Sequence, residues 1–234
     1  MSGRSIHHDN QQARKLQMVL VGKKKVGKSA TGNTILRNEQ SFESRISSTS
    51  VTQKCQMEKG RFNDQELAVV DTPGLRRGNR DKEMKEIQAC LEPGTPTVYL
   101  VVLQLGTFTE DERQMVKIIQ KAFGTEAAYY TMALFTRGDD LRADGRSVEE
   151  LIGEDSALRD FIRECHGQYH VLDNREKDDP SQVKELLQKI NLMVQRNGEA
   201  QGEANPFKRI ITLSLCAVGA IAVIGIVIGK HIVT

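Results

Sequence analysis

The sequence has little excess of charge of either sign, few cysteines and no apolar segment near its start. Its 33 Lys and Arg against 31 Asp and Glu give a net charge of +2 over 234 residues, which argues against a non-specific nucleic-acid binder. The four cysteines are scattered without close pairs in the sequence, so we expect a reducing compartment and no disulfide framework. Residues 1–15 are polar and lack the apolar core of a secretory signal, and we expect a disordered tail there.

Short apolar runs alternate with amphipathic segments through most of the chain. Strands are expected at the apolar runs, residues 15–22, 66–74, 97–106, 131–136 and 168–173, with a weaker edge strand at 51–62. Helices are expected at residues 29–37, 110–123, 148–165 and 181–196, the third interrupted near Gly153. Thr109 and Glu112 have the spacing of a capping box at the start of the second helix. This alternation predicts an α/β domain over residues 16–196 with a mainly parallel sheet.

The segment GKKKVGKS, residues 22–29, has the P-loop pattern and lies between an expected strand and an expected helix. Its glycines let the backbone wrap, so that its N–H groups face a phosphate chain. Lys28 would neutralise the β- and γ-phosphates, and the hydroxyl of Ser29 would ligate Mg²⁺. The start of the following helix adds a dipole that favours an anion. The pattern therefore predicts a site for one phosphate chain, and it leaves the lysines at positions 23–25 as surplus positive charges.

Two segments downstream would complete a phosphate and metal site. Asp71 and Gly74 belong to DTPG at the end of an expected strand, where the carboxylate would hold Mg²⁺ and the Gly74 N–H would contact a γ-phosphate. A P-loop followed by DxxG indicates a GTPase rather than a kinase or a general ATPase. The loop before that strand must offer a threonine hydroxyl to the metal, and its spacing leaves both Thr49 and Thr52 open.

The segment TRGD, residues 136–139, follows an expected strand and has the form [N/T]-K-x-D with arginine in place of lysine. Asp139 would accept hydrogen bonds from guanine N1 and N2, donors that adenine lacks. The side chain of Arg137 could lie over the base. Asp140 is the alternative carboxylate if the frame shifts by one residue, and Asn174 after the last strand is a weaker candidate for a second base contact. The sequence thus predicts a guanine reader.

Residues 210–229, IITLSLCAVGAIAVIGIVIG, carry no charge. At about 1.5 Å per residue this segment spans about 30 Å, the hydrocarbon thickness of a bilayer. It predicts a single transmembrane anchor, joined to the main domain by a polar linker at residues 197–209. Lys208 and Arg209 before the span favour a main domain on the cytosolic face of an intracellular membrane.

Six segments of the chain together resemble the GTPases of immunity-associated proteins, whose G domains are similar to those of septins and chloroplast import receptors. The resemblance covers residues 16–196 and is carried by GKKKVGKSATGNTIL, FESRISSTSVTQKC, VVDTPGL, VVLQLGTFTEDERQMVKIIQKAFG, LFTRGDDL and DNR. It implies a three-layer P-loop GTPase fold that binds GTP and GDP with Mg²⁺. It also implies dimerisation through the nucleotide-side face, oligomers with related GTPases on membranes, and a role in lymphocyte survival and immune defence.

The resemblance also implies roles for single residues at matching positions. Ser44 would lie near the ribose, and Thr52 is favoured over Thr49 as the switch threonine. The residues implied to wrap the phosphates are Gly22, Lys23, Lys24, Lys25, Val26, Gly27, Lys28, Ser29 and Ala30. The residues implied to surround guanine are Thr136, Arg137, Asp139 and Asn174. Lys24 and Lys25 depart from the family, which usually has Thr and Gly there, and we expect positions 23–25 to lie at or near the dimer face.

Two positions predict slow hydrolysis. Leu75 directly follows DTPG, where small GTPases have a glutamine that positions water, and Thr107 stands where several family members place an arginine, a candidate finger across a dimer. Without these groups we expect a loss on the order of 10³ in rate. Arg76, Arg77 and Arg80 could act in trans. A self-activating hydrolase and a GTP-loaded membrane scaffold that needs a partner for turnover therefore both stay open.

Overall fold

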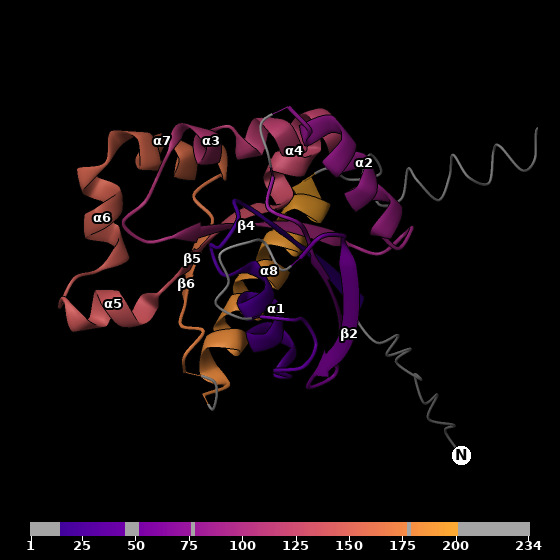
Figure 1. Ribbon diagram of the computed structural model, residues 1–234, viewed down its shortest axis with the longest axis horizontal. Helices are drawn as coiled ribbons and strands as arrows, with labels where there is room; N and C mark the ends of the chain where they lie inside the picture. Colours follow the sequence, from indigo (N-terminus) through magenta and orange to yellow (C-terminus); the bar gives the residue numbers. More distant parts are fainter. Residues whose placement is uncertain (1–14, 45–51, 76–77, 177–178, 201–234) are drawn as a thin grey trace, which may run out of the picture.

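The computed structural model describes residues 15–44, 52–75, 78–176 and 179–200 (Figure 1). Within these residues, six strands form one sheet in the order β2-β3-β1-β4-β5-β6. They are β1 (Lys15–Val21), β2 (Gln56–Phe62), β3 (Gln65–Asp71), β4 (Thr97–Gln104), β5 (Thr131–Thr136) and β6 (Tyr169–Leu172). All neighbours pair in parallel except β2 and β3, which form an antiparallel pair at one edge. The predicted mainly parallel sheet and the predicted edge strand are confirmed.

The helices cover both faces of this sheet, which gives three layers (Figure 1). In chain order they are α1 (Lys28–Leu36), α2 (Arg80–Cys90), α3 (Glu110–Arg113), α4 (Met115–Phe123), the 3-10 helix η1 (Thr125–Tyr130), α5 (Gly138–Ala143), α6 (Val148–Glu154), α7 (Ser156–Glu164) and α8 (Ser181–Ala200). Helices α1 and α8 pack on one face, and α2, α4, α6 and α7 pack on the other.

The strands bury side chains on both faces, as a parallel sheet between helices requires. Successive side chains of a strand point to opposite faces. In β1, Met18 and Leu20 therefore join the core with α1 and α8, while Val19 and Val21 join the core with α2 and α4. These four side chains are 0% exposed, which explains why the strand reads as a continuous apolar run in the sequence.

Two predicted helices are each divided into two shorter helices. The predicted helix at 110–123 divides at Gln114 into α3 and α4, and the capping box of Thr109 and Glu112 forms at its start as expected. The predicted helix at 148–165 divides at Asp155, whose carboxylate accepts hydrogen bonds from the N–H groups of Ala157 and Leu158 and so caps α7. The predicted interruption near Gly153 is thus two residues early.

Three elements were not predicted, and several predicted boundaries shift: β2 begins at Gln56, β3 ends at Asp71 rather than at 74, and α8 extends further. Helix α2 was missed because only three of its side chains are buried, Glu83, Met84 and Ile87, so the apolar stripe is narrow. The short elements η1 and α5 were also missed. Helix α8 continues to Ala200, so residues 197–200 are helical although they were predicted to begin the linker.

Two predicted segments lie largely outside the described residues. Of the predicted tail, residues 1–14 are outside them, and Lys15 is already the first residue of β1. The predicted anchor at 210–229 is also outside them. In the part of the chain that the structure describes, no helix is long and apolar enough to cross a membrane.

The parallel strands bring the chemical motifs to one edge of the sheet. GKKKVGKS follows β1, DTPG includes the end of β3, TRGD includes the end of β5, and residues 173–175 follow β6. Because the carboxyl ends of parallel strands meet along one edge, segments that are far apart in the sequence become neighbours there, the usual place for a ligand in such folds.

A close helix contact gives a first test. In α1, a Cβ at Gly32 would lie 2.6 Å from two ring carbons of Phe42, a side chain only 2% exposed. We expect Gly32→Ala to lower the free energy of unfolding by about 1–3 kcal/mol, because the buried ring must move. The measurement is unfolding in urea.

The matched control is Gly153→Ala in α6, where an added Cβ meets no described atom within 4 Å. This change should raise the free energy of unfolding by about 0.5–1 kcal/mol, since alanine favours the helix. If Gly32→Ala were stabilising like Gly153→Ala, the packing of Phe42 on α1 would be wrong.

Candidate functional site

The P-loop backbone is shaped by two glycines. A Cβ at Gly22 would lie 2.6 Å from the carbonyl oxygen of Val102, so only glycine allows the loop to pass this close to β4. Gly27 has a φ of +94° and forms the N-cap of α1. This left-handed conformation favours glycine. The loop therefore turns directly from the strand into the helix start, as the sequence pattern predicts.

Lys28 is held inside this loop. Its side chain is buried, and its Nζ donates to the carbonyl oxygen of Lys23 over 2.6 Å and to that of Gly22 over 3.4 Å. An ammonium has three N–H donors, so these contacts leave one for a phosphate. Burial lowers the pKa of Lys28 to about 8, and the negative charge of Asp71 opposes that shift.

Three oxygen-bearing side chains converge beside Lys28. Asp71 Oδ2 accepts a hydrogen bond from Ser29 Oγ over 2.6 Å and from Thr52 Oγ1 over 3.0 Å, and the two hydroxyls are 3.1 Å apart. Asp71 is 1% exposed, and burial raises its pKa against the effect of these hydrogen bonds. The structure thus brings together the three predicted metal ligands from three separate segments. Thr49, the alternative to Thr52, lies outside the described residues.

The donor set fits a magnesium ion. Hydroxyl and carboxylate oxygens are the ligands that this hard cation takes. Asp71 Oδ1 is buried and has no hydrogen-bond partner among the residues that the structure describes. A buried acceptor without a partner is costly, and a cation would satisfy it.

The DTPG turn rests directly on the P-loop. Thr72 donates from its hydroxyl to the carbonyl oxygen of Leu20 over 2.7 Å, and the N–H of Leu75 donates to that of Gly22 over 3.1 Å. A Cβ at Gly74 would lie 2.5 Å from the backbone nitrogen of Lys24. The Gly74 backbone, predicted to contact a γ-phosphate, therefore lies against the loop predicted to wrap the phosphates.

The three surplus lysines at positions 23–25 have different environments, so they do not share one role. Lys23 Nζ lies 3.2 Å from Glu112 Oε2 inside the same chain. Lys24 packs its side chain over Gly74, and Lys25 is exposed with a φ of 65°. The structure therefore uses Lys23 in an intramolecular ion pair. A role of Lys24 and Lys25 at a dimer face stays a prediction.

Glu112 is a functional candidate that the sequence did not single out for this role. It is 0% exposed, and its Oε2 also accepts hydrogen bonds from the N–H and the hydroxyl of Thr109, each over 2.9 Å. Within the described part of the chain, its other oxygen, Oε1, has no hydrogen-bond partner. The capping box was visible in the sequence, but its contact with the P-loop was not.

On the side predicted to hold the base, Thr136 and Asn174 contact the P-loop and α1. Thr136 is buried, and its hydroxyl donates to the carbonyl oxygen of Val26 over 2.9 Å. Asn174 accepts a hydrogen bond from Thr34 Oγ1 over 2.9 Å and donates to Thr31 Oγ1 over 3.2 Å. Both side chains therefore tie the strand ends to the phosphate loop and its helix.

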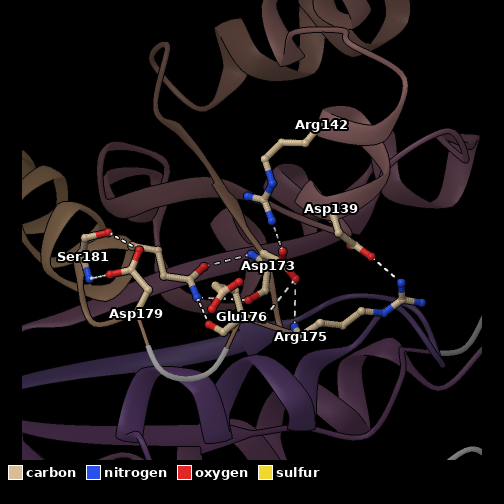
Figure 2. A network of polar contacts seen from close by, with 8 residues as sticks. Asp139, Arg142, Asp173, Arg175, Glu176, Asp179 and Ser181 are labelled. Carbon is tan, nitrogen blue, oxygen red and sulfur yellow. Dashed lines mark hydrogen bonds and ion pairs between the residues drawn. The ribbon is translucent and has the colours of Figure 1, made fainter.

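The two candidate carboxylates for reading the base each have an arginine partner. Asp139 Oδ2 accepts a hydrogen bond from Arg175 over 2.5 Å, and Asp140 Oδ2 lies 2.6 Å from Arg137 Nε. Figure 2 shows Asp139 and Arg175 pointing toward each other from α5 and from the segment after β6. Arg137, predicted to lie over the base, is thus paired with Asp140, and Arg175 is a further residue that the sequence did not indicate.

A cavity of about 310 Å³ lies between α1 and the segment after β6. It brings together three residues predicted to contact nucleotide, Ala30, Ser44 and Asn174. The remaining lining residues are Asn33, Thr34, Arg37, Asn38 and Glu39. A volume in this range is typical of small-molecule sites.

Among the hydrolysis candidates that the structure describes, none supplies a free charge. Thr107 is exposed, and its hydroxyl donates to the carbonyl oxygen of Gln104 over 3.3 Å. Leu75 packs against the hydrophobic core. Arg80 pairs with Asp111 over 2.9 Å. The other two arginines, at positions 76 and 77, lie outside the described residues.

Comparison with known protein sequences identifies related chains. The sequence profile of the AIG1 family matches residues 16–216. GTPase IMAP family member 8 of Homo sapiens is 36% identical over 194 residues, which cover 80% of this chain and 29% of that protein. Immune-associated nucleotide-binding protein 10 of Arabidopsis thaliana is 34% identical over 192 residues, which cover 77% of this chain and 41% of that protein. This chain thus spans less than half the length of either relative.

Solved structures share the fold. Toc33 of Arabidopsis thaliana, in complex with GDP and Mg²⁺, aligns with a TM-score of 0.58 at 20% identity over 78% of this chain and 85% of that one. A dimerisation-deficient mutant of Toc33 aligns with a TM-score of 0.61 at 22% identity over the same shares. At these identities the likeness is one of fold, and it agrees with the predicted P-loop GTPase architecture.

The ion pair of Lys23 and Glu112 gives a second test. In Lys23→Met, the carboxylate of Glu112, which is 0% exposed, would lose its counter-charge. We expect a loss of about 1–3 kcal/mol in the free energy of unfolding, less than for a fully buried pair because the Lys23 side chain is 29% exposed. Chemical denaturation of the nucleotide-free protein measures it.

The exposed Lys25→Met is the matched control and should change stability little. Adding Glu112→Gln to Lys23→Met should recover part of the loss, because the uncompensated charge is removed while a capping side chain remains. Equal costs for Lys23→Met and Lys25→Met would contradict the pairing.

Proposed function

This chain belongs to the AIG1 family, and from that membership and its site we propose that it binds GTP and GDP with Mg²⁺ and acts as a GTP-dependent switch. The observation that carries the proposal is the convergence of Ser29 and Thr52 on Asp71 beside the buried Lys28. A lysine, two hydroxyls and a carboxylate at a helix start are the groups that a nucleoside triphosphate with its metal requires.

In this proposal each side chain has a separate role at the phosphates. Lys28 keeps its two contacts with P-loop carbonyls and offers its third N–H to a phosphate oxygen. Ser29, Thr52 and Asp71 would hold a magnesium ion, which would supply positive charge to offset the phosphate charges. Thr52 comes from the loop before β2, so we propose that its contact at the metal site depends on whether a γ-phosphate is bound.

We propose Asp139 as the reader of guanine. Its carboxylate can accept from N1 and N2 of the base only after Arg175, which now donates to Oδ2, has moved aside. The Arg175 side chain is 76% exposed in this pair, so its displacement into solvent is inexpensive. Thr136 supports the reader indirectly by holding Val26 of the P-loop.

Intrinsic hydrolysis is proposed to be slow. Leu75 occupies the position after DTPG with its side chain against the core and its N–H on Gly22. Thr107 carries no charge. The Leu75 side chain can neither orient water nor neutralise developing charge, and Thr107 cannot neutralise that charge. The alternative function is a GTP-loaded membrane scaffold with little turnover of its own, in which a partner supplies the missing group.

Attachment to a membrane, assembly and an immune role complete the proposal. The uncharged residues 210–229 support a C-terminal span that leaves the GTPase domain on the cytosolic face of an intracellular membrane. The Arabidopsis relative is named as an immune-associated nucleotide-binding protein, which supports a related role here. For chloroplast translocon components with this fold, dimerisation is important for GTPase activity, which supports homo- or hetero-oligomers with related GTPases.

Base recognition is tested by exchanging carboxylate for amide. Asp139→Asn removes the charged acceptor for guanine N1 and N2, and we expect GTP and GDP affinity to fall about 10- to 100-fold. Asp140→Asn, which changes the neighbouring carboxylate, should change affinity little. The measurement is equilibrium binding of GDP, GTP and ATP, with ATP weak throughout. A larger loss for Asp140→Asn would assign the reader to Asp140.

Anchoring and turnover can be tested on one preparation. The full-length chain reconstituted into neutral liposomes should float with them, and a chain ending at Arg209 should not.

Single-turnover hydrolysis at low surface density should stay near the intrinsic rate of small GTPases, on the order of 10⁻⁴ to 10⁻³ per second. A rate that rises with density favours the self-activating hydrolase, and a rate that stays flat favours the scaffold. Fast hydrolysis at low density would contradict slow intrinsic turnover.

A further inference from the structure

Cys55 and Cys90 are 35 positions apart in the sequence but lie side by side in the fold. The Sγ of Cys90 donates to the backbone carbonyl oxygen of Cys55 over 3.9 Å. Besides burial, the neighbouring Cys90 contributes to the raised pKa of the Cys55 thiol, as expected for two side chains that lie close together. Both residues are half-buried and pack against the same hydrophobic core. The structure therefore holds a thiol pair where the sequence showed only scattered cysteines.

This pair joins the segment that carries Thr52 to the helix that follows the DTPG turn. Cys55 lies three residues after Thr52 and directly before β2, whose first residue, Gln56, pairs with Asp71. Cys90 is the last residue of α2, the helix that follows the DTPG turn. A covalent bond between the two thiols would tie the loop that carries Thr52 to the helix behind Asp71.

We propose that Cys55 and Cys90 are a site of reversible disulfide formation that holds the Thr52 segment in place. With a peroxide as oxidant, one thiol is oxidised to a sulfenic acid and one water is released. The second thiol then displaces the hydroxyl group, which leaves as a second water, and the S–S bond forms. In total two thiols lose two hydrogens and one peroxide is reduced to two waters. A small-molecule dithiol reverses the step by exchange.

The environments of the thiols make this reaction slow. Burial, together with the neighbouring Cys90, raises the pKa of Cys55 to about 12, so its thiol is a poor nucleophile. Once either thiol of the pair is oxidised, the proximity of the other favours the resolving step. Cys165 is fully buried, and burial raises its pKa as well. This leaves Cys165 inert, and the overall reaction is expected to be slow.

The consequence for the site follows from where Thr52 lies when the thiols are adjacent. In this arrangement Thr52 Oγ1 contacts Asp71. Three residues span at most about 10 Å of extended chain, so a bond at Cys55 restricts how far Thr52 can move away. Oxidation should therefore slow the opening of this loop and the release of nucleotide. The effect on nucleotide rests on the proposed function, whereas the disulfide itself does not.

The first experiment maps the bond. The full-length protein is treated with hydrogen peroxide, its remaining thiols are alkylated, and its peptides are analysed by mass spectrometry with and without a dithiol. We expect a Cys55–Cys90 crosslink within one chain that is lost in Cys90→Ser and in Cys55→Ser, and kept in the control Cys165→Ser. Crosslinks only between chains, or no crosslink at these two cysteines, would overturn the proposal.

The second experiment measures the consequence without any variant. Hydrogen exchange of residues 52–56 should slow in the oxidised wild-type protein and return with a dithiol. Release of a fluorescent GTP analogue should slow about fivefold or more, the low end of typical couplings between sites. Unchanged exchange in crosslinked protein would overturn the proposed restraint. If the reduced protein retains no guanine nucleotide, the proposed function fails, while crosslink and hydrogen exchange still decide on the disulfide.

Discussion

The carboxylate of Asp71 accepts hydrogen bonds from two hydroxyl groups at the buried end of β3. The arrangement of the site depends on this convergence. Ser29 reaches it from the start of α1 and Thr52 from the loop before β2. Burying a carboxylate is costly unless donors or a cation compensate it. Here the two hydroxyls and the nearby charge of Lys28 provide that compensation for one oxygen, and the other oxygen is left without a partner among the described residues. The geometry is therefore set for a cation.

Contacts from a strand, a turn and a helix hold the phosphate loop around this point. Thr136 fixes Val26 from the end of β5, Leu75 donates to Gly22 from the DTPG turn, and Glu112 holds Lys23. Each contact comes from a different segment that the parallel sheet brings to the same edge. A loop supported on several sides keeps its N–H groups oriented before any ligand arrives, which lowers the cost of ordering on binding.

The base side of the site is organised differently, by ion pairs near the surface. Asp139 and Asp140 each face an arginine, and the partners come from different segments in the first case and from the same turn in the second. Exposed pairs of this kind contribute little to stability and exchange partners readily. The phosphate side is thus buried and pre-formed, whereas the base side can rearrange. The thiol pair of Cys55 and Cys90 belongs to the phosphate side, because Cys55 lies three residues after Thr52.

The sequence by itself determined the α/β fold, the parallel strands and the P-loop, because strand periodicity, glycine spacing and the order of motifs are local properties of the chain. It also indicated Ser29, Asp71 and, through resemblance, Thr52 as one group, which the fold brings together. It did not show α2, whose apolar stripe is narrow, or the place where capping by Asp155 divides a helix. Only the tertiary structure decided that Lys23 meets Glu112, that Arg175 meets Asp139 and that Cys90 meets Cys55. These contacts join residues 35 to 89 positions apart, and no local pattern specifies them, because they follow from how helices and loops pack over the sheet.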